Sequence, residues 1–300
     1  MSSTVAPAKR SNVTATGRRA HAPSSNARSR ERTFSILCRA VLIAFALLWL
    51  IPFAWSLVTS LRPEAEIANH PTSWWSNHWT FDAYNKVISS TDIGLWYVNS
   101  FIIAALSALF TVIVCSMVGF ALAHTRFRAR GAVAGLILIG LMIPTQVLIL
   151  PQFLEFKLSH LLGTYWAIIL PTLAAPVAVF IFRSFLMGIP DSLIEAARID
   201  GAGWWRIYRQ VTMPLCRPAI SAVTIFTFVT TWNNLLWPLL VLSNTRQMTI
   251  PVGLATVQGG FGIRYAEVMA SAVLGAIPLL AVFLLFQRQI VQGVASTGIK

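Results

Sequence analysis

Charged residues are scarce in this 300-residue chain. Only 11% of the residues are Asp, Glu, Lys or Arg, whereas 56% are apolar and the mean hydropathy is +0.68. A soluble globular domain carries about 25% charged residues. Six apolar runs reach the roughly 20 residues that a helix needs to cross a bilayer: 36–61, 96–123, 132–153, 161–182, 218–242 and 268–286. Backbone amides inside a membrane must be satisfied within the segment, so we predict an all-α integral membrane protein with six transmembrane helices.

The sequence also lacks the motifs of most enzymes. The three cysteines, Cys38, Cys115 and Cys216, form no C-x-x-C pair, and the five histidines have no metal-ligand spacing. None of the four lysines follows a glycine, so the phosphate-cradling loop of many ATPases is missing. The acidic residues lie at span edges and in loops, away from any nucleophile–base arrangement. We therefore predict no catalytic residue, no metal site and no cofactor bound by this chain.

The interiors of the predicted spans contain no Asp, Glu, Lys or Arg. A carrier that couples solute movement to ions or protons usually needs an ionisable group there. This absence counts against a stand-alone secondary carrier. A carrier or channel acting alone, and a membrane scaffold or receptor, remain the alternatives to a subunit of a larger transporter.

The net charge of +13 is distributed unevenly about the spans. The gaps after the first, third and fifth runs carry five basic and six acidic residues, and the other side carries 18 basic and four acidic ones. Basic residues accumulate on the cytoplasmic side of membrane proteins. The pattern therefore predicts a multi-pass membrane protein with both termini in the cytoplasm. It gives no reason to expect a nucleic-acid partner.

A polar segment, residues 188–214, separates the fourth and fifth runs on this basic side. Ser192 and Glu195 fit an S-x-x-E capping box, which predicts that a short helix starts near Ser192. Gly201 stands where the end of that helix needs positive φ. A second helix is then expected, with an apolar stripe at i, i+3, i+4 and i+7 formed by Trp204, Ile207, Tyr208 and Val211. The alternative is an ordinary amphipathic surface loop.

This segment resembles the EAA loop, E-A-A-x(3)-G-x(9)-I-x-L-P, of permease subunits of ATP-binding-cassette importers. The residues that match are Glu195, Ala196, Ala197, Gly201 and Pro214, with Val211 and Met213 as conservative replacements. Asp200 beside Gly201 and the C-terminal segment from Gln287 are similar to the carbohydrate-uptake branch, whose familiar members are maltose permeases. The resemblance covers the chain from about Phe34 to Lys300.

The resemblance implies a division of the chain and a set of partners. Residues 34–94 would be the first helix and an outer loop, 95–287 the permease core, and 288–300 a cytoplasmic tail. The resemblance does not cover residues 1–33, whose basic, Ser- and Ala-rich composition instead predicts a disordered cytoplasmic tail that touches membrane lipid. The resemblance also implies a location in the cell membrane of a prokaryote, together with a second permease subunit, two copies of a cytoplasmic ATPase and an extracytoplasmic solute-binding protein. ATP and Mg would be bound by the ATPase. Glu195, Ala196, Ala197, Asp200, Gly201 and Pro214 would form the ATPase-coupling site. The expected solute is a sugar or a sugar-like molecule, with glycerol phosphate or glycerophosphodiesters as the alternative.

Two further segments are candidates for contact with solute or with the binding protein. In the fifth span, Trp232, Asn233 and Asn234 could hydrogen-bond and stack on a polyhydroxylated solute, or they could hold the helix bundle together. In the following outer loop, Pro251, Val252 and Gly253 indicate a turn between helices. The resemblance implies that this turn faces the binding protein.

Overall fold

The computed structural model describes residues 25–259 and 264–297, and within them it contains helices and no strand. The chain divides into two compact units, residues 1–52 and 53–300, which are described separately. The sequence predicted an all-helical protein, and the described residues confirm this. Three helices are long and apolar enough to span a membrane by themselves, and the number rises to six if each of three sharply bent helix pairs counts as one span.

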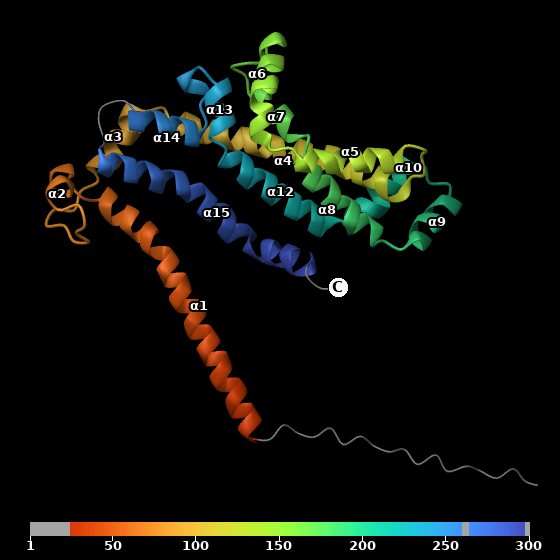
Figure 1. Ribbon diagram of the computed structural model, residues 1–300, viewed down its shortest axis with the longest axis horizontal. Helices are drawn as coiled ribbons and strands as arrows, with labels where there is room; N and C mark the ends of the chain where they lie inside the picture. The colour runs from red at the N-terminus through yellow and green to blue at the C-terminus, as the bar shows by residue number, and fades with distance from the viewer. Residues whose placement is uncertain (1–24, 260–263, 298–300) are drawn as a thin grey trace, which may run out of the picture. The chain divides into compact units, whose positions relative to one another are not determined.

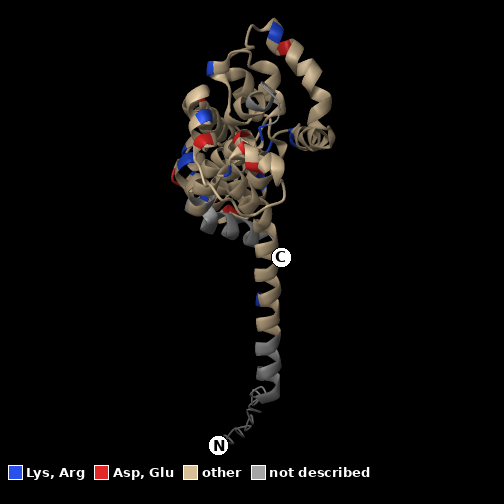
Figure 2. Cartoon of the chain, turned by 90° about the vertical axis from the view of Figure 1, so that its left-hand side faces the viewer, with Lys and Arg blue, Asp and Glu red and all other residues tan. Residues whose placement is uncertain are grey.

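The first unit contains most of helix α1 (Ser25–Ser60). The predicted tail ended at residue 33, but residues 25–33 are already helical, whereas residues 1–24 lie outside the described part. Extending an existing helix avoids the cost of a new nucleus, so the helix continues beyond the apolar run. From Phe34 to Ser60, helix α1 exposes a nearly continuous apolar surface. This part of α1 is almost free of charge (Figure 2).

The second unit is built around helix α4 (Ile93–His124), which packs against α8 (Pro176–Met187) and α12 (Arg217–Trp232) (Figure 1). Helix α15 (Tyr265–Thr297) packs against α12 in turn. Small residues bring α4 and α8 close together. A Cβ added to Gly119 would lie 2.8 Å from the Cβ of Phe182. The backbone of α15 continues into the predicted tail 288–300 as far as Thr297.

Two of the predicted spans are broken where a proline follows a residue with non-helical backbone angles. The run 132–153 forms α5 (Arg130–Met142), η1 (Thr145–Leu148) and α6 (Ile149–Leu158), with a 94° bend before η1. The run 161–182 forms α7 (Trp166–Thr172) and α8, which meet at 43°. Pro144 and Pro176 follow the breaks, and proline disfavours helical geometry in the residue before it. Each of these two runs is therefore a bent pair of helices, and the predicted count of six spans holds only if each bent pair is counted as one span.

The fifth predicted span, 218–242, also contains a break. Helix α12 ends at Trp232, and α13 (Leu236–Val241) follows after three residues. Before α12 the chain passes through α10 (Trp204–Arg206), a π-helical turn η2 (Ile207–Thr212) and α11 (Met213–Leu215). This short stack meets α12 at 80°.

Helices α2 (Glu64–Asn69) and α3 (Asp82–Ser90) lie at the end of the second unit that is farther from α10 (Figure 1). The buried Arg62 guanidinium donates hydrogen bonds to the carbonyl oxygens of Ser73 (2.7 Å) and His70 (3.0 Å). The Glu64 carboxylate accepts from the first two amides of α15, those of Tyr265 and Ala266, both at 2.9 Å. Such capping satisfies amides that have no partner within the helix.

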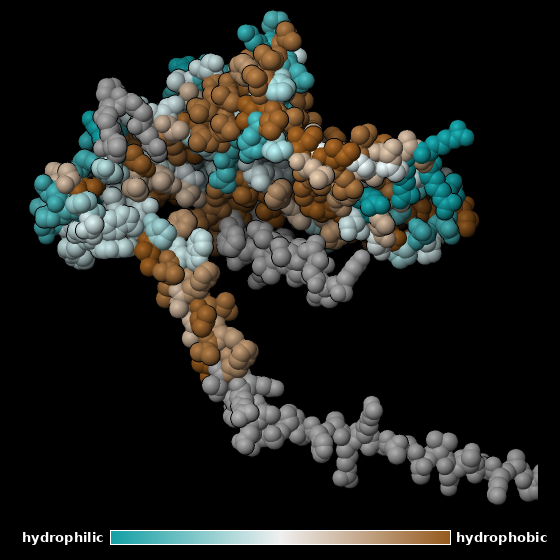
Figure 3. Space-filling model, in the orientation of Figure 1, coloured by the Kyte–Doolittle hydropathy of each residue, from teal (hydrophilic) through white to brown (hydrophobic). Residues whose placement is uncertain are grey.

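Hydrophilic residues gather mainly at the end that holds α2 and at the end that holds α9 (Asp191–Ile199), with an apolar surface between them (Figure 3). Helices α5 and α6 contain no buried residue. A band of this kind is typical of a surface that faces lipid or another membrane subunit.

Candidate functional site

Helix α9 contains the Glu-Ala-Ala sequence and begins one residue earlier than predicted. Pro190 is its N-cap, with φ −58° and ψ 130°, and no side chain caps the helix. Ser192 therefore lies within the first turn, and the predicted capping box does not form. The proline backbone is already set for this position, so the helix can start without a capping hydroxyl.

The end of α9 is a Schellman motif centred on Gly201. Gly201 has φ +77°, its amide donates to the carbonyl of Arg198 (3.0 Å), and the amide of Ala202 donates to that of Ala197 (2.9 Å). These two bonds satisfy carbonyls that the helix end leaves unpaired. The predicted positive φ at Gly201 is confirmed. The chain turns sharply after α9 as a result, and α9 forms a short, separate knob.

Helix α9 keeps most of its surface free. Ile194, 6% exposed, is its buried residue, and Ala197 packs partly against the same core cluster. Glu195, Ala196 and Asp200 are exposed, and Ile199 exposes 86% of its surface. An apolar side chain this exposed beside a carboxylate and small residues is typical of a docking surface. Pro214, the last residue of the motif, is also exposed and lies in α11, just before the bend into α12.

The segment after α9 connects this knob to the central helix α4. Ile207 and Tyr208 are buried and Val211 is partly buried, as the predicted stripe requires. Trp204 is exposed instead, and the Arg198 guanidinium lies 5.0 Å above its ring. The Tyr208 hydroxyl lies 2.8 Å from the Ser116 hydroxyl of α4 in a buried hydrogen bond. A movement of α9 can therefore be transmitted to α4 through these packing contacts.

The predicted pathway residues lie at the end of α12, where they make packing contacts. Trp232 is buried with its ring stacked on that of Phe228, and Asn234 is partly buried. Asn233 is exposed, and its side-chain amide donates to the carbonyl of Val229 at 2.9 Å. These contacts are those expected of residues that end a helix.

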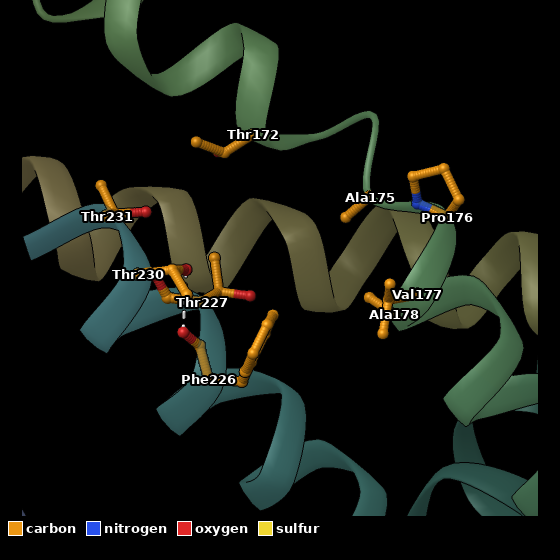
Figure 4. Close-up of a pocket in the computed structure, with 9 residues that line it drawn as sticks. All are labelled: Thr172, Ala175, Pro176, Val177, Ala178, Phe226, Thr227, Thr230 and Thr231. Atoms are coloured by element: carbon orange, nitrogen blue, oxygen red, sulfur yellow. Dashed lines mark hydrogen bonds between the residues drawn. The ribbon is translucent and has the colours of Figure 1, made fainter. Parts of the chain in front are cut away.

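A pocket of about 240 Å³ lies nearby, between α12 and the break that separates α7 from α8 (Figure 4). None of the three predicted pathway residues lines it. Its lining is formed by Thr172, Ala175, Pro176, Val177, Ala178, Phe226, Thr227, Thr230 and Thr231. Reasoning from the sequence missed the α7–α8 side of this pocket. Pro171 and Pro176 inside an apolar run were the signal that could have indicated it, because interrupted membrane helices often border binding sites.

The predicted outer turn is helical and mostly buried. Residues 250–259 form α14 (Ile250–Gly259), so the expectation of a turn was wrong. Val252 is 0% exposed, Gly253 is buried, and Pro251 is partly exposed. A Cβ on Gly253 would overlap the Trp96 ring, whose Nε1 donates to the carbonyl of Thr245 at 2.8 Å.

The side-chain amide of Asn99 anchors the same outer segment on α4. It donates to the carbonyl oxygens of Arg246 (2.8 Å) and Met248 (2.9 Å), and its oxygen accepts from the Tyr165 hydroxyl at 2.6 Å. The buried Ser100 hydroxyl accepts the amide of Ile250 at 2.8 Å. The segment from 245 to 253 is therefore held on the first turns of α4. Elsewhere, the described residues contain no cluster of three His, Cys, Asp or Glu side chains that could hold a metal ion.

Comparisons with known proteins bear on this arrangement. The sequence profile of the family described as "Binding-protein-dependent transport system inner membrane component" matches residues 115–296. The chain is 35% identical to the arabinooligosaccharides transport system permease protein AraQ of Halalkalibacterium halodurans, over 90% of this chain and 99% of AraQ. It is 32% identical to the sn-glycerol-3-phosphate transport system permease protein UgpE of Yersinia pestis, over 89% of this chain and 98% of UgpE.

A solved structure supports the fold. A chain of a bacterial ABC transporter involved in the import of the acidic polysaccharide alginate superposes with a TM-score of 0.74 at 22% identity, covering 86% of this chain and 97% of that one. The profile and the relatives together settle the family. This chain belongs to the inner-membrane components of binding-protein-dependent transport systems and is a permease subunit of an ATP-binding-cassette importer of the carbohydrate-uptake type.

Proposed function

We propose that this chain is one of two different permease subunits that together form the membrane pathway for a sugar or sugar-like solute. An extracytoplasmic binding protein delivers the solute, and two copies of a cytoplasmic ATPase subunit drive its transport. The relatives' names support the solute class, and the family supports the binding protein. Six membrane spans with both termini in the cytoplasm agree with the distribution of basic residues.

The observation that carries this proposal is the exposed knob α9. Its face with Glu195, Ala196 and Ile199 has no partner among the described residues, although it is apolar enough to need one. We propose that this face sits in a groove of the ATPase. ATP-driven closure of the ATPases then moves α9, and the bundle changes between inward-open and outward-open states. Such coupling requires that the two ATPase states hold α9 in different positions.

On the outer side, α14 supports contact with the binding protein at its exposed edge. Pro251 provides part of that edge, whereas Val252 and Gly253 are buried and support it by packing inside the protein. Trp232, Asn233 and Asn234 remain candidates for the pathway at the break between α12 and α13. Asn234 is the better candidate of the two amides, because the Asn233 amide already caps α12.

The alternative solute is glycerol phosphate or a glycerophosphodiester, which the similarity to UgpE favours. A less favoured alternative is a carrier that acts alone. Uptake of labelled arabinotriose and of labelled sn-glycerol 3-phosphate, in cells with and without the chain, separates the two solute classes. Flux through the chain alone in liposomes would overturn the subunit proposal.

The partner proposal is tested by affinity purification of the tagged chain from native membranes. We expect an ATPase and a second six-helix permease to co-elute. Ile199→Asp should remove the ATPase from the eluate while leaving the second permease. A matched control is Leu215→Asp, which also places a carboxylate at an exposed apolar position but outside α9. Retention of the ATPase by the Ile199 variant would exclude α9 as the docking element.

A further inference from the structure

We propose that the pocket between α12 and the α7–α8 break binds one ring of a neutral sugar within the membrane. This inference rests on the proposed function and names a solute site within this subunit. The pocket, about 240 Å³, is smaller than the roughly 300–1,000 Å³ of pockets for drug-sized ligands. It therefore suits a single ring of an oligosaccharide that passes through, rather than a whole oligosaccharide.

The first argument is a pair of threonine hydroxyls that make no hydrogen bond within the described residues. Thr227 and Thr231 each expose only 6% of their surface and line the pocket, and no other described residue forms a hydrogen bond with their side-chain hydroxyls. Two other lining threonines are satisfied by their own helices. Thr230 donates to the carbonyl of Phe226 at 2.9 Å and Thr172 to that of Ile169 at 2.7 Å. Neither hydroxyl oxygen is enclosed, so both are accessible to form hydrogen bonds with a ligand in the pocket.

The second argument is the start of α8 on the opposite wall, which Figure 4 shows facing the α12 threonines. Pro176 is its first residue and has no N–H. The amides of Val177 and Ala178 follow, and the first turn of a helix has no internal acceptors for such amides. Neither amide bonds to another described residue. One wall thus offers amide donors and the other offers hydroxyls that both donate and accept.

The lining is mostly apolar, with a few hydrogen-bonding groups and no charged side chain, which favours a neutral ligand such as a sugar ring. Sugar hydroxyls can accept from the amides and exchange hydrogen bonds with Thr227 and Thr231. A helix start also attracts anions, but no Lys or Arg lines this pocket. Burying a phosphate or carboxylate here would leave its charge without a counter-ion, which is strongly unfavourable. The Phe226 ring adds an apolar surface for the face of a sugar ring.

The test measures protection of a cysteine in the pocket from a maleimide. Val177→Cys keeps the backbone amide and lies in the lining, and Cys38→Ser removes the partly exposed native thiol. The variant is prepared as the complex purified with its partners, in lipid nanodiscs without nucleotide. The probes are L-arabinose, D-glucose, D-galactose and N-acetylglucosamine, with sn-glycerol 3-phosphate as the anion. We expect at least one neutral sugar to slow labelling and glycerol 3-phosphate to have no effect.

Adding Thr227→Val or Thr231→Val should raise the sugar concentration needed for half protection by roughly three- to tenfold, because each removes one hydrogen bond. Thr224→Val, the same change on α12 outside the lining, should leave it unchanged. Protection by glycerol 3-phosphate alone would overturn the neutral class, and no protection by any probe would overturn the site. The assay needs no ATP hydrolysis or uptake, so its failure is distinct from failure of the proposed function.

Discussion

Gly201 and Gly253 are required for different physical reasons. At Gly201 the backbone has φ +77°, and an added Cβ would meet open space, so the requirement is conformational. At Gly253 the same atom would overlap the Trp96 ring, so the requirement is steric. The first could be deduced from the sequence, because a helix ending is a local event. The second could not, because Trp96 is 157 positions away in the chain.

Gly201→Val should abolish uptake while leaving membrane insertion intact. A β-branched residue with positive φ costs about 1–2 kcal/mol, enough to reorient the end of α9. Gly201→Asn is the control, because asparagine tolerates this conformation, and it should retain most uptake. Solute uptake and the amount of chain in the membrane are the measurements. Normal uptake by the valine variant would show that the shape of the α9 end is unimportant.

Gly253→Ala should destabilise the chain by about 1–3 kcal/mol through overpacking against Trp96. The Trp96 ring is buried and held by its hydrogen bond to Thr245, so it has little freedom to move away. Thermal unfolding in detergent measures the effect. Gly94→Ala, which meets no atom within 4 Å, is the matched control and should change little. Equal stability of both variants would contradict the packing of α14 on α4.

At the scale of elements, side-chain hydrogen bonds organise the outer segment that contains α2, since little of it is buried. The Ser76 hydroxyl and the Asn77 amide donate to the Glu66 carboxylate. The Ser76 hydrogen bond is the main cause that lowers the pKa of Glu66, and desolvation opposes it. The Asn77 amide, Arg62 and His78 lower this pKa further. Folding therefore favours the ionised carboxylate.

A lowered folded-state pKa means that Glu66 stabilises this segment at pH above its ordinary value of about 4.3, and that the stabilisation is lost as the pH falls through the lowered pKa. Amide exchange of residues 62–80, corrected for intrinsic pH dependence, should increase at acidic pH. Glu66→Gln should show faster exchange already at neutral pH and a weaker response to acid. Glu155→Gln, whose side chain lies on α6, is the control. A pH response in Glu66→Gln equal to that of the native chain would assign the effect to another group.

At the scale of the whole molecule, the chain is a multi-pass protein of the bacterial inner membrane. As a permease it is not itself catalytic and binds no cofactor, and the ATPase is a separate subunit. Its described surface has the two features that such a subunit needs, an exposed knob at one polar end and a broad apolar band. Neither feature stabilises the isolated chain. Both therefore indicate that the chain functions as part of a complex with other subunits.

The purified chain alone should show no ATP hydrolysis, whereas co-expression with its partner subunits should give turnover. A Glu195→Lys variant should assemble with the second permease but reduce turnover, since it reverses the charge on the exposed face of α9. Phosphate release from purified samples is the measurement. Hydrolysis that persists in the isolated chain would contradict the absence of a phosphate-cradling loop.

Local features of the sequence were enough to identify the apolar runs, the uneven distribution of charge and the glycine that ends α9. Each depends on neighbouring residues and on their transfer between water and lipid. Only the tertiary structure decided the angles at the helix breaks, the burial of α14 and the pocket beside Thr227 and Thr231. These depend on which distant helix lies opposite. Within an apolar membrane run, residues that face lipid and residues that face another helix are both apolar, so the sequence does not show which of them is buried. The proline before a break can be read from the sequence, but the direction in which the chain then turns is set by what it packs against.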